Sequence, residues 1–256
     1  MTRIGVVAHP DRYAAVRAAG ADYLEPTLVG GLVQATADGW SPGATLPGDM
    51  RAPGFCILFP GHLTIGDPAF PREPIRDHLE RTFAHIAPWA EQGATIVLGS
   101  GAARRTPSGV SREAAAASLA DVARIGDDIA KRYGYELLLE PLNSSETDQI
   151  NGFAEGVAFL DAHGLDDMRL VCDWYHLVLG GEGLDDVLPH VDRVGHVHLA
   201  ETDRRVAPGA GEWPLESLVR GLLDAGYSGN VSIECNWADF DAEAPDAVAL
   251  VRSWTE

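Results

Sequence analysis

The chain has 256 residues, and its 38 acidic and 19 basic side chains give it a formal net charge of −19. Nucleic acid backbones and anionic membranes require a basic surface, so this charge argues against both as partners. Because 46% of the residues are hydrophobic, the chain can bury a sizeable core, which excludes a disordered protein.

Short apolar runs alternate with longer amphipathic stretches along the chain. Eight of these runs are bounded by Gly, Pro or polar residues and are predicted as buried parallel strands: Ile4–Val7, Tyr23–Glu25, Phe55–Phe59, Thr95–Leu98, Leu137–Glu140, Leu170–Asp173, Val194–Leu199 and Ser232–Cys235. Helices are predicted over Ser111–Tyr133, Gly152–His163 and Leu215–Ala225. The Gly- and Pro-rich segment Trp40–Gly54 is predicted as one loop.

Strands that alternate with helices over about 250 residues predict an α/β fold, with residues 1–256 forming one (β/α)8 TIM barrel. A doubly wound sheet is the alternative. No Gly-x-Gly-x-x-Gly segment follows the first strand, which disfavours a dinucleotide-binding sheet. No apolar run reaches the roughly 18–20 residues of a membrane span and no signal peptide is recognisable, so a cytoplasmic protein is expected.

The lysine and cysteine counts disfavour further kinds of chemistry. Lys131 is the single lysine, and the segment around it is predicted to end a helix. Schiff-base enzymes need a lysine amine in the active site, so lysine aldolase and PLP mechanisms are disfavoured. Cys56, Cys172 and Cys235 are too far apart in sequence for a disulfide framework or a Cys-x-x-Cys metal site, and they indicate a reducing compartment.

The last four predicted strands carry metal-binding residue types at or near their ends. Glu140, Asp173, His198 and Glu234 occupy these positions. In a barrel such ends converge on the C-terminal mouth, and four of them together predict a site for a hard divalent ion, Mn²⁺, Mg²⁺ or Co²⁺. His196 lies on the same strand face as His198, so either histidine could be the ligand, or His196 could be a buried group behind the ligands.

These residues resemble the xylose-isomerase-like TIM barrels, the sugar phosphate isomerase/epimerase family. Within that family the resemblance is to ketose 3-epimerases of the D-tagatose/D-allulose 3-epimerase type. It is carried by the segments Glu140–Glu146, Asp173–His176, Gly195–His198 and Glu201–Val206, and by Glu234. It covers Tyr135 to Trp237 strongly and the N-terminal half weakly. The segment Arg205-Val206-Ala207-Pro208-Gly209 departs from the family's usual Val-Pro-Gly by an extra alanine.

The resemblance implies a ligand set, two bases and a set of substrate contacts. Metal ligands would be Glu140, Asp173, His198 and Glu234, and the ion would be Mn²⁺ in the first instance. Glu140 and Glu234 would also be the bases of a C3 epimerisation through an enediolate. Glu146, His176 and Arg204 would contact the sugar. The loops after the last two strands are acidic rather than Gly-rich, so an unphosphorylated small-molecule sugar is expected.

Several alternatives stay open or are disfavoured. An aldose–ketose isomerase of the hydroxypyruvate or rhamnose type shares the enediolate, and an inosose-type dehydratase would use the same metal site. An endonuclease acting at abasic sites needs a basic groove and more histidines, which this chain lacks. A sugar-binding protein without activity is disfavoured because both bases are present. A homo-oligomer is compatible with the sequence.

Overall fold

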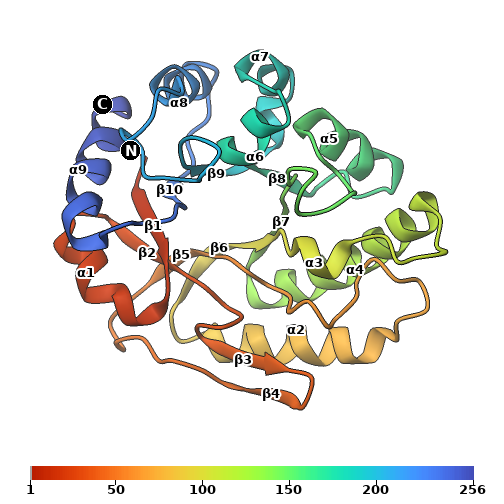
Figure 1. Ribbon diagram of the computed structural model, residues 1–256. Helices are drawn as coiled ribbons and strands as arrows, with labels where there is room; N and C mark the ends of the chain where they lie inside the picture. The colour runs from red at the N-terminus through yellow and green to blue at the C-terminus, as the bar shows by residue number, and fades with distance from the viewer. Residues whose placement is uncertain (1) are drawn as a thin grey trace.

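The predicted strands form a parallel ring at the centre of the protein (Figure 1). This computed structural model describes residues 2–256, and in that part of the chain the sheet has eight strands. They are β1 (Ile4–Ala8), β2 (Tyr23–Pro26), β5 (Ala52–Phe55), β6 (Ala90–Leu98), β7 (Glu136–Leu139), β8 (Arg169–Asp173), β9 (Val194–Leu199) and β10 (Val231–Ile233). The predicted TIM barrel is therefore confirmed.

The ring closes between β2 and β5. The paired strands run in the order β2-β1-β10-β9-β8-β7-β6-β5, so these two strands are the ends of the ladder. Just beyond them, the Leu28 N–H donates to the Cys56 carbonyl at 2.8 Å, and the Val29 N–H donates to the Ile57 carbonyl at 3.0 Å. This closure excludes the doubly wound sheet, which would leave two open edges.

Helices cover the outside of the ring (Figure 1). They are α1 (Tyr13–Ala18), α2 (Arg72–Ile86), α3 (Gly101–Arg104), α4 (Arg112–Tyr133), α5 (Phe153–Ala162), α6 (Trp174–Leu179), α7 (Leu184–Val187), α8 (Leu215–Asp224) and α9 (Phe240–Trp254), with 3-10 turns η1 (Pro10–Arg12) and η2 (Leu188–Arg193). The three predicted helices are confirmed as α4, α5 and α8. For α4 the reason is local: Ser111 accepts a hydrogen bond from the Ala114 N–H, and Gly134 ends the helix with φ of 74°.

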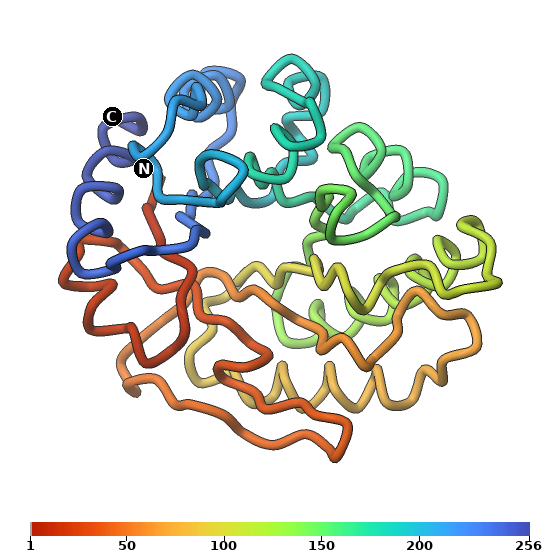
Figure 2. Tube along the Cα trace, viewed as in Figure 1, coloured from red at the N-terminus to blue at the C-terminus, as the bar shows by residue number. Residues whose placement is uncertain are grey.

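A β-hairpin replaces the helix between β2 and β5. It consists of β3 (Val33–Thr36) and β4 (Gly39–Pro42), and it lies beside α2, where the Trp40 indole N–H donates to Thr82 Oγ1 at 3.2 Å (Figure 2). The predicted loop Trp40–Gly54 is therefore wrong at both ends, since Trp40 lies in β4 and Gly54 in β5.

The third barrel strand also starts and ends earlier than predicted. It covers Ala52–Phe55 instead of Phe55–Phe59. The sequence Ala-Pro-Gly-Phe has weak strand preference, and pairing with β6 overrides it. Beyond the strand, Ile57 has a φ of 58°, in the left-handed region that β-branched residues avoid.

Side chains inside the ring form an apolar layer next to the polar site. Val7, Cys56, Val97, Leu138 and Val171 make this buried cluster, which is separate from the larger core that includes the helices. Successive strand residues face opposite sides. Leu138 therefore shares the inner face with Glu140, and Val171 shares it with Asp173.

Cys172 faces the outer core, as expected for a packing residue and not a ligand. None of the helices within residues 2–256 has the length and apolar character of a membrane span.

Candidate metal centre and active site

The four predicted metal ligands converge at one end of the ring. Glu140, Asp173, His198 and Glu234 each offer one ligand atom, and these atoms lie within 4.8 Å of one another. They come from the ends of the adjacent strands β7 to β10, where neighbouring parallel strands bring equivalent positions together. The first three side chains are almost fully buried, and that of Glu234 is 20% exposed.

The surroundings of His198 Nδ1 are those expected of a nitrogen that binds a cation. His198 Nδ1 lies 2.7 Å from Glu234 Oε2 and 3.7 Å from Glu140 Oε1. This nitrogen is buried and has no hydrogen-bond partner with acceptable geometry among residues 2–256. A cation between the imidazole and the carboxylates would satisfy it. One imidazole nitrogen and carboxylates from three residues form a donor set that fits a hard divalent ion.

The two glutamates of the cluster have different electrostatic environments. Burial raises the pKa of Glu140, and the charges of Glu234 and Asp173 raise it further. Burial alone would also raise the pKa of Glu234, but the positive charges of His198 and Arg205 lower the pKa of Glu234 to about 2.

Arg205 supplies a positive charge that the sequence analysis did not assign. Its Nη2 lies 2.9 Å from Asp173 Oδ2 and 2.8 Å from Glu234 Oε2. The guanidinium carbon lies 4.8 Å from the centroid of the Tyr175 ring. The predicted substrate contact Arg204 is instead exposed at the surface of the same loop, and its carbonyl accepts a hydrogen bond from Asn236 Nδ2.

The other predicted substrate contacts lie together at the mouth. His176 is buried in α6, with its Nε2 3.6 Å from Asp173 Oδ2. The Asn143 backbone N–H donates to His176 Nδ1 at 3.2 Å, so neutral His176 carries its proton on Nε2. Glu146 is 40% exposed and lies 3.9 Å from His176 Nδ1. His176 thus points an N–H group toward the cluster, and Glu146 lies nearer to solvent.

Glu25 is a further buried carboxylate, next to the four clustered residues, and the sequence analysis did not assign it a role. Its Oε1 lies 3.1 Å from His198 Nε2, and its Oε2 lies 2.8 Å from His196 Nε2. Burial would raise the pKa of Glu25, but His196 and His198 hold it well below the usual value. The signal that could have found Glu25 is its place at the end of a strand, which it shares with the ligands.

Gly99 makes room for the Glu140 carboxylate. It follows β6, and a Cβ atom at this position would lie only 2.0 Å from Glu140 Oε2. Any side chain at residue 99 would therefore force the Glu140 carboxylate to shift.

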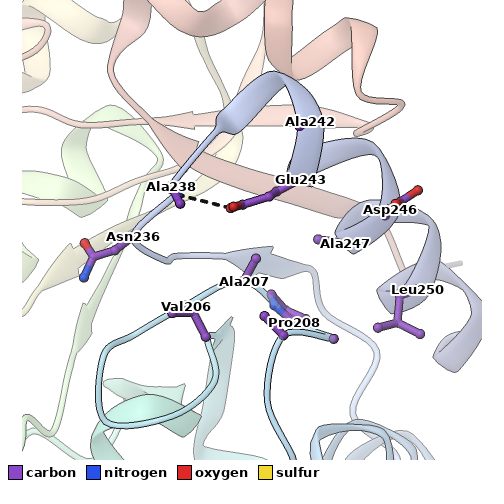
Figure 3. Close-up of a pocket in the computed structure, with 12 residues that line it drawn as sticks. Val206, Ala207, Pro208, Asn236, Ala238, Ala242, Glu243, Asp246, Ala247 and Leu250 are labelled. Atoms are coloured by element: carbon purple, nitrogen blue, oxygen red, sulfur yellow. Dashed lines mark hydrogen bonds between the residues drawn. The ribbon is translucent and has the colours of Figure 1, made fainter.

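A cavity of about 500 Å³ lies beside the centre, between the loop after β9 and helix α9 (Figure 3). Its lining is largely apolar, with Val206, Ala207 and Leu250 among the contributing side chains, and it includes none of the four clustered ligands. Figure 3 shows Glu243 accepting a hydrogen bond from the Ala238 N–H within this wall. The cavity is a neighbour of the site and does not contain it.

Comparison with protein families gives one match over most of the chain. The family described as "Xylose isomerase-like TIM barrel" matches residues 13–255.

Individual relatives align over shorter parts of the chain. A Streptomyces coelicolor protein with the provisional name hydroxypyruvate isomerase is 38% identical over 112 residues, which are 41% of this chain and 40% of that protein. A D-psicose 3-epimerase of Agrobacterium fabrum is 33% identical over 108 residues, 42% of this chain and 37% of the relative. These alignments thus span about two fifths of the relatives' own lengths.

Solved structures match the chain over nearly its whole length. The D-allulose 3-epimerase of Methylomonas sp. has a TM-score of 0.79 at 20% identity, covering 99% of this chain and 98% of that one. The IOLI protein, solved with a bound zinc atom, has a TM-score of 0.71 at 16% identity and covers 99% of this chain and 96% of its own. At these identities the likeness shows that the barrel fold is shared.

Proposed function

The chain belongs to the xylose isomerase-like TIM barrel family, and from this premise we propose that it is a divalent-metal-dependent enzyme that epimerises a small ketose at C3. The observation that carries the proposal is the convergence of Glu140, Asp173, His198 and Glu234. The D-psicose 3-epimerase relative supports a ketose as substrate, and the zinc in the IOLI protein supports a metal ion. Mn²⁺ is the ion that we favour, with Co²⁺ and Mg²⁺ as alternatives.

The reaction requires a proton to leave a carbon beside a carbonyl group and to return on the opposite face. A divalent ion held by the four ligands would supply positive charge beside the carbonyl and hydroxyl oxygens, where negative charge develops. Glu140 and Glu234 follow β7 and β10, the outer two of the four strands that carry the proposed ligands, so we expect them to approach a substrate from different sides. Each has a second carboxylate oxygen to remove or return the proton.

The remaining residues of the mouth would orient the sugar. The Nε2–H of His176 and the guanidinium of Arg205 are donors that face the cluster, and they suit the oxygens of a ketose. Glu146 Oε1 lies 3.9 Å from His176 Nδ1. A sugar hydroxyl bound beside His176 would therefore be near enough to donate a hydrogen bond to Glu146.

A solvent-exchange experiment tests the role of the bases. We expect wild-type protein with Mn²⁺ to exchange the substrate α-proton with deuterium from D₂O, and Glu140→Gln and Glu234→Gln to lose this exchange by at least about 100-fold, as for lost acid–base catalysis. Removal of metal with EDTA should abolish exchange, and added Mn²⁺ should restore it. Full exchange in Glu140→Gln, or activity after complete metal removal, would contradict the mechanism.

A second candidate is the isomerisation of hydroxypyruvate, which involves the same proton movement. Two observations favour it: the 38% identity to the Streptomyces coelicolor protein, and the Arg205 guanidinium beside the cluster. Hydroxypyruvate carries a carboxylate, which could pair with Nη1 of Arg205, since Nε and Nη2 already contact Glu234 and Asp173. Product analysis with D-psicose, L-ribulose and hydroxypyruvate in parallel separates the two functions, since an epimer forms in one case and an aldehyde in the other.

A further inference from the structure

We propose that Glu25 is a positioning residue of the metal centre, which holds the His198 ring so that Nδ1 faces the ion. This inference rests on the metal site proposed above. Glu25 is the penultimate residue of β2 and is completely buried, whereas the four proposed ligands lie at or just beyond the ends of β7 to β10. Among residues 2–256, its hydrogen bond to the four-residue cluster goes to His198, whose other ring nitrogen faces the Glu234 carboxylate.

The carboxylate of Glu25 receives hydrogen bonds on both oxygens. Oε1 faces His198 Nε2 at 3.1 Å. Oε2 faces His196 Nε2 at 2.8 Å and accepts from the Ser232 hydroxyl at 2.6 Å. The Tyr23 hydroxyl lies 2.7 Å from Ser232 Oγ and fixes the direction of that group. Three donors therefore converge on two oxygens, and the contact to His198 has little freedom to move.

This contact determines which nitrogen of His198 is available to an ion. A neutral imidazole carries one proton, and the nitrogen facing an acceptor keeps it. With an ion bound, the ring of His198 would be neutral. Its Nε2–H would donate to Glu25, and the lone pair of Nδ1 would face the ion on the side of Glu140 and Glu234. The opposite tautomer would place an N–H group where the ion binds. Carboxylates that hold a ligand histidine in this way typically contribute about 10- to 100-fold to metal affinity.

Glu25, His196 and His198 could be read as a second metal site, since their ligand atoms also lie within 4.8 Å of one another. The hydrogen bonds argue against this reading. The Ser232 hydroxyl also donates a hydrogen bond to the Glu25 carboxylate. Ser232 and the three residues of the group are almost fully buried. The geometry is that of a hydrogen-bonded group, so we expect one bound ion per chain.

The decisive measurement is the Mn²⁺ dissociation constant. It is obtained from a titration in which the electron paramagnetic resonance signal reports the concentration of free Mn²⁺. Glu25→Gln keeps the shape of the side chain, but its single acceptor oxygen cannot serve all three donors. We expect a 10- to 100-fold weaker affinity. The control is Glu136→Gln, which removes the same charge at the opposite end of β7, where Glu136 pairs with Arg169 at 2.5 Å. Its affinity should stay within threefold of wild type.

Wild-type protein provides an independent test if Glu25→Gln fails to fold. With Mg²⁺ bound, long-range ¹H–¹⁵N spectra of histidine-labelled protein should show His198 protonated on Nε2 and unprotonated on Nδ1. The reverse tautomer, or unchanged Mn²⁺ affinity in folded Glu25→Gln, would overturn the positioning role and leave the proposed function intact. Two ions per wild-type chain would also overturn it. Failure of wild type to bind any divalent ion would overturn both proposals.

Discussion

Arg204 and Arg205 are adjacent in the chain but lie in opposite surroundings. Arg205 reaches Asp173 and Glu234, whereas Arg204 is exposed. The backbone of the loop explains the difference, because Thr202 and Arg205 have φ values of 61° and 54° and turn the chain sharply. The extra residue Ala207 follows directly in this loop. A pattern of residue types does not reveal such a turn, which is why the family resemblance pointed to Arg204 and not to Arg205.

Exchanging each arginine for glutamine separates the two interpretations. Arg205→Gln should reduce kcat/KM by at least about 100-fold, which corresponds to about 2.7 kcal/mol, because a guanidinium beside the reacting atoms is lost. Arg204→Gln should stay within threefold of wild type. The measurement is steady-state turnover of whichever substrate the product analysis identifies. A large loss in Arg204→Gln with little change in Arg205→Gln would restore the sequence-based assignment.

At the same scale, the clustering of the four proposed ligands was predictable from the sequence, and the residues that surround them were not. Glu140, Asp173, His198 and Glu234 each lie at or next to the end of an apolar strand, which is a local signal that four strands repeat. Glu25 also lies near the end of a strand, but its histidine partners are 171 and 173 residues away in sequence. The closed ring brings Glu25 next to His196 and His198. The role of Glu25 could therefore not be predicted from the spacing of residues along the sequence.

Among the elements, predictions succeeded where short-range chemistry decides the structure. Helix α4 begins at a serine cap and ends at a left-handed glycine, and both signals are visible in the sequence. The position of strand β5 was predicted wrongly because its Pro and Gly residues disfavour strands. The strand forms nevertheless because it pairs with β6. The β3–β4 hairpin was missed for a related reason, since its strands are mostly exposed and carry little apolar alternation.

The end of β6 offers a test of how one element shapes the site on its neighbour. Gly99→Ala would place a methyl group 2.0 Å from Glu140 Oε2, so the carboxylate must move. We expect at least a tenfold loss of Mn²⁺ affinity. Gly48→Ala is the matched control, because a Cβ there meets no atom within 4 Å.

Calorimetric titration with Mn²⁺ measures both glycine variants, and thermal melting without metal verifies that each is folded. Equal affinity in Gly99→Ala and wild type would show that the Glu140 carboxylate is not a ligand in its present position.

For the molecule as a whole, the acidic centre concentrates charge that an ion would neutralise. Glu140, Asp173 and Glu234 each offer a carboxylate oxygen within 4.8 Å of the others, and the positively charged Arg205 contacts Asp173 and Glu234. A ligand that binds only the folded state stabilises it in proportion to the logarithm of its concentration. The protein should therefore be more stable with its ion than without it.

Thermal unfolding with and without Mn²⁺ measures this stabilisation. At 100 times the dissociation constant the free energy of unfolding should rise by about 2.7 kcal/mol. For a chain of this size that corresponds to an increase in Tm of roughly 5–10 °C. Asp173→Asn should lose most of the increase, and Glu136→Gln should keep it. An unchanged Tm in wild type at these concentrations would argue against a structural contribution of the ion.

The contact between Glu25 and His198 also links metal binding to the order of folding. It spans 173 residues, and contacts of such separation form late because a long loop must close first. A refolding chain can gather β7 to β10, and with them all four ligands, before β2 joins β10 through β1. Such an intermediate would hold its ion weakly, and full affinity would arrive only when the ring is complete. If refolding chains are mixed rapidly with Mn²⁺, the rate of Mn²⁺ uptake should then report the rate at which the barrel closes.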